Sequence, residues 1–174
     1  MKKILTTMVI AVTATAISCS GENSGTKERT PEEIAKLSPK EFANDFNEIW
    51  VEGIEQLSAL LDKYPQLNAD FDKESSEIVD ATIYKVVKYG AFLDGITEEE
   101  KFNYLLACQT FPTVDGADVL TPFIEKLNSR FEEFMEYNRD VYYNTAEINV
   151  LPMYLKFDDL RENHPYRAEK YGIK

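Results

Sequence analysis

Cys108 and His164 are the residues of this chain best suited to nucleophilic or metal chemistry. The chain has 174 residues, with one histidine and two cysteines. Because a protein zinc site usually takes three or four ligands from His, Cys and carboxylates, we expect no zinc centre. A cysteine–histidine nucleophile pair needs only proximity in space. Cys108 has no Gly-rich oxyanion turn beside it, and Asn163-His164-Pro165 has the pattern of a helix cap and turn. The sequence therefore predicts a partly buried, non-catalytic thiol at Cys108.

The carboxylates are numerous, but their spacing does not predict a metal site. The segment Asn68-Ala69-Asp70-Phe71-Asp72-Lys73 begins like a calcium loop, yet lysine stands where the loop needs glycine, and Val79 stands where it needs glutamate. Further acids without ligand spacing are Asp115, Asp118, Asp158 and Asp159. With 31 Asp and Glu residues, pairs that could flank a glycosidic bond are expected by number alone. We expect no metal and no cofactor.

The C-terminal third carries the residues best suited to binding. Tyr137 and Tyr143 would suit a protein, peptide or glycan partner if their rings are exposed, because tyrosine is enriched in binding surfaces. The alternative is that these rings face the core and their hydroxyls face solvent. Asn138 interrupts an apolar stripe, where it would either fix the register of packed helices or line a ligand cleft. These three residues form the predicted binding surface.

Helix-capping patterns divide the rest of the chain into helical segments. Thr30-Pro31 opens a short helix, and Ser38-Pro39-Lys40-Glu41 is a capping box before a long amphipathic helix that ends at Pro65. We expect Trp50 on the inner face of that helix. A second helix is predicted to begin near Lys73 and to end at Gly95.

Two further helices and a tail complete the pattern. Thr97-Glu98-Glu99-Glu100 caps a short helix, residues 110–119 read as a loop, and Thr121-Pro122 opens a fourth main helix. The inner residues expected in the short helix are Phe102, Leu105, Leu106 and Gln109, and those expected in the fourth are Phe123, Leu127, Phe131, Phe134, Met135, Val141 and Tyr142. From Val150 onward we expect short helical pieces. The prediction is an all-α, bundle-like domain of about four main helices with short C-terminal helical pieces.

Composition limits the classes of partner. The chain is 44% hydrophobic and 12% aromatic, which is enough for a core in one domain. Its net charge of −12 argues against binding nucleic acid, because phosphate contacts need clustered Lys and Arg. The charge permits a cationic partner, and it also serves simply to keep a protein soluble.

The N-terminus resembles the signal peptide of bacterial lipoproteins. Met1-Lys2-Lys3 precedes a short apolar stretch, and Ala16-Ile17-Ser18-Cys19 follows it. The stretch is shorter than the roughly 20 residues that span a bilayer. The resemblance implies cleavage before Cys19 and lipidation of that cysteine. It also implies anchoring, favouring the outer membrane because Ser20, not aspartate, follows. The alternative is cleavage after Ala14-Thr15-Ala16, which would give a secreted chain in which Cys19 could pair with Cys108.

The sequence thus predicts a signal peptide over 1–18, a lipidated cysteine and flexible tether over 19–30, and an acidic helical domain over 31–174. The favoured function is a non-catalytic envelope lipoprotein that acts by binding an unidentified protein, peptide or glycan. Three alternatives stay open: a periplasmic immunity-type inhibitor of a cationic toxin, a soluble secreted helical protein, and an envelope enzyme that uses carboxylates.

Overall fold

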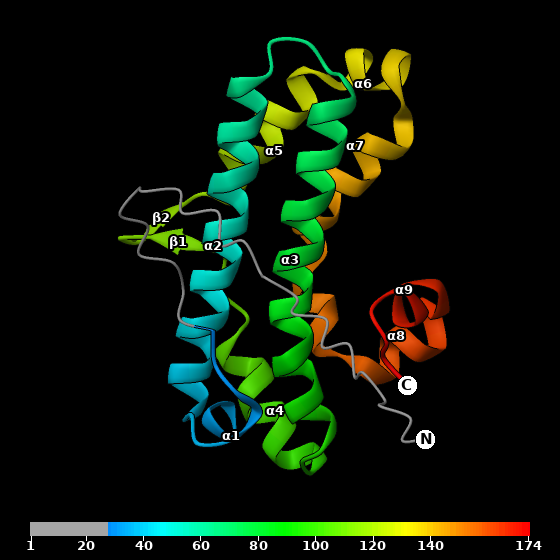
Figure 1. The fold of residues 1–174 in the computed structure, drawn as a ribbon. Helices are drawn as coiled ribbons and strands as arrows, with labels where there is room; N and C mark the ends of the chain where they lie inside the picture. Colours follow the sequence, from blue (N-terminus) through cyan, green and yellow to red (C-terminus); the bar gives the residue numbers. More distant parts are fainter. Residues whose placement is uncertain (1–27) are drawn as a thin grey trace, which may run out of the picture.

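The computed structural model describes residues 28–174, so the predicted signal peptide, Cys19 and most of the predicted tether lie outside the described residues. The chain folds as an all-α domain, as predicted (Figure 1). Two long helices, α2 (Pro39–Lys63) and α3 (Ala69–Asp94), run antiparallel side by side through its centre. No helix within residues 28–174 has the length and apolar character needed to cross a bilayer.

The predicted capping box at the start of α2 is confirmed. Ser38 Oγ accepts a hydrogen bond from the Glu41 N–H, and the Glu41 carboxylate accepts one from the Ser38 N–H at 2.9 Å. Trp50 is buried on the inner face, and its indole Nε1–H donates to the Ile148 carbonyl oxygen at 2.8 Å. This bond joins α2 to a segment 98 residues later in the chain.

Helix α3 begins four residues before the predicted start at Lys73. Asn68 Oδ1 accepts hydrogen bonds from the backbone N–H groups of Asp70 and Phe71 at 3.0 and 2.9 Å. Asparagine is among the best N-cap residues because its side chain can satisfy these unpaired donors. The segment that resembles the start of a calcium loop is therefore the capped first turn of a helix.

Helix α4 (Glu98–Ala107) forms as predicted but presents a different face to the core. Phe102 and Leu106, both expected inside, are 62% and 52% exposed. Leu105 packs against the core as expected, and beside it lies Tyr104. The Tyr104 hydroxyl donates to the Leu37 carbonyl oxygen at 2.8 Å, and its ring packs edge-on against Phe42. A tyrosine on the inner side can bury its ring and still hydrogen-bond its hydroxyl, which explains why α4 turns this face toward the core.

The predicted fourth helix is three helices, and a small hairpin precedes it. The elements are β1 (Thr113–Val114), β2 (Ala117–Asp118), α5 (Leu120–Ser129), α6 (Phe131–Tyr137) and α7 (Arg139–Ala146). The first break is at Arg130, whose guanidinium donates to the carbonyl oxygens of Leu61 and Tyr64 and so closes the end of α2. Phe131, expected inside, is largely exposed after this break.

The second break corrects the prediction for Asn138. Its backbone is extended, with φ −169° and ψ 111°, and its side-chain oxygen accepts from the Asp140 N–H at 3.0 Å. Asn138 is therefore the exposed N-cap of α7 and not a polar residue on a buried stripe. The local reason is the same cap preference that sets the start of α3.

The tail consists of short helical pieces, as predicted. They are the 3₁₀ segment η1 (Glu147–Leu155), α8 (Phe157–Asn163) and α9 (Pro165–Lys170). The segment η1 lies along α3, and the two pack tightly at Gly90. A Cβ atom there would lie 2.4 Å from the Tyr154 carbonyl oxygen and 2.4 Å from a ring carbon of Phe157. Only glycine fits this contact without displacing the backbone.

Candidate functional site

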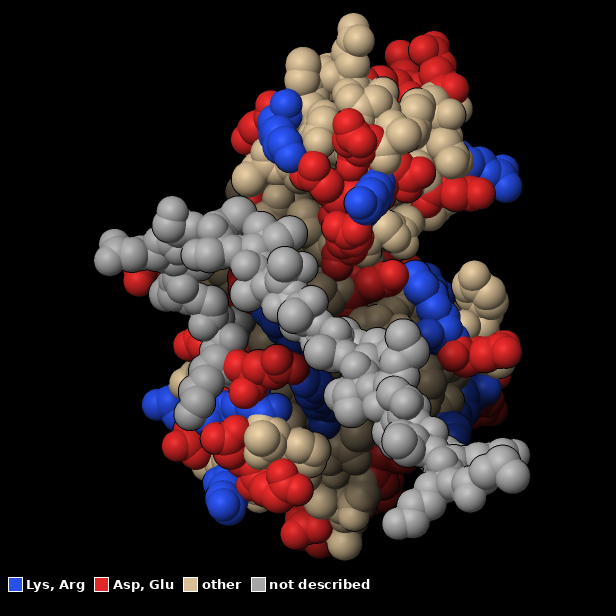
Figure 2. Space-filling model, viewed as in Figure 1, with Lys and Arg blue, Asp and Glu red and all other residues tan. Residues whose placement is uncertain are grey.

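A polar cleft of about 610 Å³ lies between α7 with η1 on one side and α8 with α9 on the other. Figure 2 shows the surface hollowed on the right, between the part that holds α6 and α7 and the part that holds α8 and α9. The cleft is lined by Asp140, Tyr143, Asn144, Glu147, Tyr154, Asn163, His164, Pro165, Tyr166, Arg167, Lys170 and Tyr171. Its volume is in the usual range for small-molecule sites.

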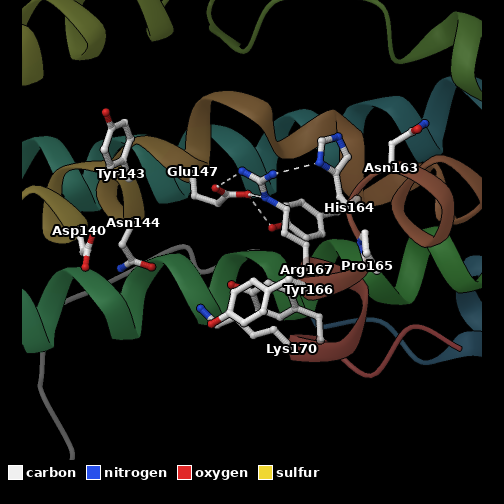
Figure 3. A pocket seen from close by; sticks show the side chains of 12 residues that line it. Asp140, Tyr143, Asn144, Glu147, Asn163, His164, Pro165, Tyr166, Arg167 and Lys170 are labelled. Atoms are coloured by element: carbon white, nitrogen blue, oxygen red, sulfur yellow. Dashed lines mark hydrogen bonds and ion pairs between the residues drawn. The ribbon is translucent and has the colours of Figure 1, made fainter.

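An ion pair between Arg167 and Glu147 forms the centre of the cleft (Figure 3). Arg167 Nε and Nη2 donate to Glu147 Oε1 and Oε2 at 2.6 and 2.9 Å, which is a bidentate arrangement. The Tyr154 hydroxyl donates to the same Oε1 at 2.7 Å. The hydrogen bond to the Glu147 carboxylate raises the pKa of Arg167. The pKa of Tyr154 is raised mainly by burial and also by its hydrogen bond to Glu147. Arg167 and Tyr154 therefore both keep their protons, and the charges of Arg167 and Glu147 cancel.

His164 extends this centre toward the other side of the cleft. It lies between α8 and α9, where the sequence predicts a cap and turn. Arg167 Nη1 lies 3.2 Å from His164 Nδ1. A guanidinium group can only donate, so Nδ1 accepts and the ring hydrogen is on Nε2. His164 can thus offer an Nε2–H donor to a ligand.

A second ion pair joins the cleft residue Lys170 to α3. Lys170 Nζ and the Tyr171 hydroxyl both donate to Asp80 Oδ1, at 2.9 and 2.7 Å. The Tyr171 ring is buried. The pKa of its hydroxyl is raised mainly by this burial and also by the hydrogen bond to Asp80. These contacts attach α9 to α3 and pair the ammonium group of Lys170 with a carboxylate.

Two exposed tyrosine rings lie on different sides of the cleft. Tyr143 on α7 is 59% exposed, and its ring packs edge-on against Tyr142. Tyr166 on α9 is 78% exposed. Figure 3 shows Tyr143, with Asp140 and Asn144 below it, at one end of the cleft, and Asn163 at the other. The cleft therefore combines aromatic surface with planar polar side chains.

The structure brings together only part of the predicted binding surface. Tyr143 lines the cleft, whereas Tyr137 is 39% exposed on α6 and Asn138 caps α7, and neither lines it. Sequence reasoning missed Glu147 and Arg167, which are 20 residues apart and meet only through the fold. The available signal was the turn at His164, which places α9 beside the tyrosine-rich segment.

Cys108 and His164 line different concavities, so the structure does not assemble a cysteine–histidine pair from them. Cys108 is the C-cap of α4 and is buried, more fully than the partly buried thiol that the sequence predicts. Burial raises the pKa of its thiol to about 12. Since the thiolate is the nucleophile, this environment makes Cys108 inert near neutral pH. Among residues 28–174, no group of three or more His, Cys, Asp or Glu is arranged to hold a metal ion.

A second concavity of about 420 Å³ is apolar. It lies between α4 and η1, and its lining includes Trp50, Phe102, Leu106, Phe111 and Leu155. It differs from the polar cleft in its leucine side chains and its smaller number of hydrogen-bonding groups. Comparisons of the chain with protein-family models, with curated proteins and with solved structures find no match.

Proposed function

We propose that the chain is a non-catalytic lipoprotein of the bacterial cell envelope, with the outer membrane favoured. Lipid at Cys19 would hold it on the membrane, and its helical domain would act by binding a partner in the polar cleft. The observation that carries the binding role is the cleft itself, because its cations Arg167 and Lys170 are each paired with a carboxylate while aromatic rings stay exposed on two sides.

The protonation behaviour of the acidic groups supports binding over catalysis. Each carboxylate in residues 28–174 with a clearly shifted pKa has that pKa lowered, as for Asp94 beside Arg161 and Glu133 beside Arg130. A general acid at neutral pH needs the opposite shift, which burial away from cations would give. The buried thiol of Cys108 is also held in its protonated form.

The anchored state is tested by expressing the full chain in a bacterial host and separating membranes from soluble fractions. We expect the chain in the membrane fraction, an intact mass that corresponds to acylated Cys19, and release on Cys19→Ala. A soluble chain that begins at Ile17 would instead support secretion. Because acylation adds about 0.8 kcal/mol of membrane affinity per buried CH₂, loss of the lipid should be decisive for partition.

The inhibitor of a cationic toxin is the second candidate, favoured by the net charge of −12. Figure 2 shows carboxylates over the whole visible face with Lys and Arg among them, so this face has no single acidic patch. A toxin inhibitor would bind a basic protein with an affinity that falls steeply with salt concentration. Binding in the cleft with little salt dependence would favour the first proposal.

A further inference from the structure

We infer that the polar cleft binds a neutral carbohydrate, with sugar rings stacked on Tyr166 and Tyr143 and hydroxyl groups bonded to the polar side chains between them. This inference rests on the proposed binding role of the cleft and adds the chemical class of the ligand. Three properties of the lining select that class: its charge balance, its mainly aromatic carbon surface, and its hydrogen-bonding groups.

The charge balance disfavours an ionic ligand. Arg167 is committed to Glu147 through two hydrogen bonds, and Lys170 is committed to Asp80. An anionic ligand would have to displace a carboxylate from one of these cations. A cationic ligand would have to displace a cation, and breaking a partly buried pair leaves the other charge uncompensated. The remaining carboxylate of the lining, Asp140, lies 3.7 Å from Arg139 and is 83% exposed, so water screens its charge. A ligand without charge leaves all of these pairs intact.

The apolar side chains that line the cleft are four tyrosines and Pro165, with no leucine, isoleucine, valine or methionine among them. A lipid chain or an apolar peptide side chain would need surfaces such as those of Leu106 and Leu155, which belong to the other concavity. The exposed carbon in the cleft is the flat face of tyrosine rings, above all Tyr166. A pyranose ring presents a matching flat face of C–H groups, which packs against an aromatic ring.

The polar side chains match the hydroxyl groups of a sugar. Each hydroxyl can donate one hydrogen bond and accept two. Asn144 and Asn163 offer both donors and acceptors, Asp140 offers acceptors, and the Nε2–H of His164 offers a donor. Because Tyr143 and Tyr166 are on α7 and α9, two stacking positions lie on separate elements. The arrangement thus suits an oligosaccharide of more than one ring.

The test uses the full chain, purified from a bacterial host, in isothermal titration with soluble probes at millimolar concentration. The neutral probes are hexamers of α-1,4-glucose, β-1,4-glucose, β-1,3-glucose, β-1,4-xylose and β-1,4-mannose. The charged probes are oligogalacturonate and oligolysine. We expect at least one neutral hexamer to bind, with an affinity that changes less than twofold between low and high salt, because no ion pair is formed.

Variants locate the binding. Tyr166→Ala and Tyr143→Ala should each lower the affinity about tenfold, the factor that corresponds to losing roughly 1.4 kcal/mol of stacking. Both rings are exposed, so their removal should leave the melting temperature unchanged. Phe102→Ala is the matched control, since it removes an exposed ring from α4 outside the cleft and should not alter affinity.

Each other outcome overturns the inference. These outcomes are binding of no neutral hexamer, binding of only a charged probe, and neutral binding that survives both tyrosine substitutions or is lost with Phe102→Ala. Titration does not depend on anchoring, so the two proposals fail separately. Membrane-bound chain that binds no sugar would contradict the ligand alone, and sugar binding by a chain that Cys19→Ala does not release would contradict the anchor alone.

Discussion

Gly90→Ala should strongly destabilise the domain, although the same change in an ordinary helix is favourable. In a helix interior, alanine is better than glycine by about 1 kcal/mol because the backbone loses less entropy on folding. At Gly90 the added Cβ would lie 2.4 Å from the Tyr154 carbonyl oxygen. Normal carbon–oxygen contacts are about 3.3 Å or longer, so roughly 1 Å of movement is needed.

The size of the effect follows from what has to move. The obstructing atom belongs to the backbone of η1, and a ring carbon of Phe157 blocks a second direction at 2.4 Å. Overpacking of a rigid site costs about 1–3 kcal/mol, and sometimes more. Two obstructing contacts at 2.4 Å place Gly90 at the upper end of that range. After subtracting the gain of about 1 kcal/mol in helix propensity, we expect a net loss of about 2 kcal/mol. For a domain of this size that is a fall in melting temperature of about 4–8 °C.

Thermal unfolding followed by far-UV circular dichroism measures this loss, and chemical unfolding gives its free energy. Gly95→Ala is the matched control, because a Cβ at Gly95 would meet only ordinary contacts, the nearest at 3.6 Å, and its φ is −92°. That variant should unfold within a degree or two of the parent chain. If Gly90→Ala were as stable as Gly95→Ala, the close packing of α3 on η1 would be wrong.

Trp50→Ala should lower the free energy of unfolding by about 3–5 kcal/mol, because it removes a large buried ring and the indole donor to the Ile148 carbonyl oxygen. A loss near zero in denaturant titration would mean that the ring is not buried. Glu133→Gln should lower the free energy of unfolding at neutral pH but not in acid. The Arg130 guanidinium lowers the pKa of Glu133 below its value in the unfolded chain. The ionised Glu133 therefore stabilises the fold above about pH 4.3, and this stabilisation is lost as the pH falls through the folded pKa. Glu132→Gln, which removes an exposed carboxylate from the same turn, should not reproduce this pH dependence. Cys108 should react with a thiol reagent at pH 7 only at the rate of unfolding, and rapid labelling of the native chain would contradict the raised pKa.

Features set by neighbouring residues could be predicted from the sequence. The capping boxes at Ser38 and Thr97 occur where expected, because each depends on a hydroxyl and a glutamate three residues later. The break at Asn138 was missed, because the apolar spacing of the flanking residues continues across it and only the cap preference of asparagine signals an interruption.

The cleft could not be predicted for a different reason. Its two cations pair with distant carboxylates, Arg167 with Glu147, 20 residues away, and Lys170 with Asp80 of α3, 90 residues away. Charged residues are frequent in this chain, so no local pattern separates these four from the others. Of the two tyrosines predicted to bind a partner, Tyr143 lines the cleft and Tyr137 does not.

The contact between α9 and α3 can form only late in the synthesis of the chain. Tyr171 and Ile173 belong to the buried core, and the Tyr171 hydroxyl bonds to Asp80, which is made 91 residues earlier. At about 5–20 residues per second, a ribosome needs roughly 5–18 s to cover that distance. During this interval one face of α3 has no covering segment. A chain whose last core contacts form so late stays unfolded in part during synthesis, and the export proposed above would require that state for passage through a secretion channel.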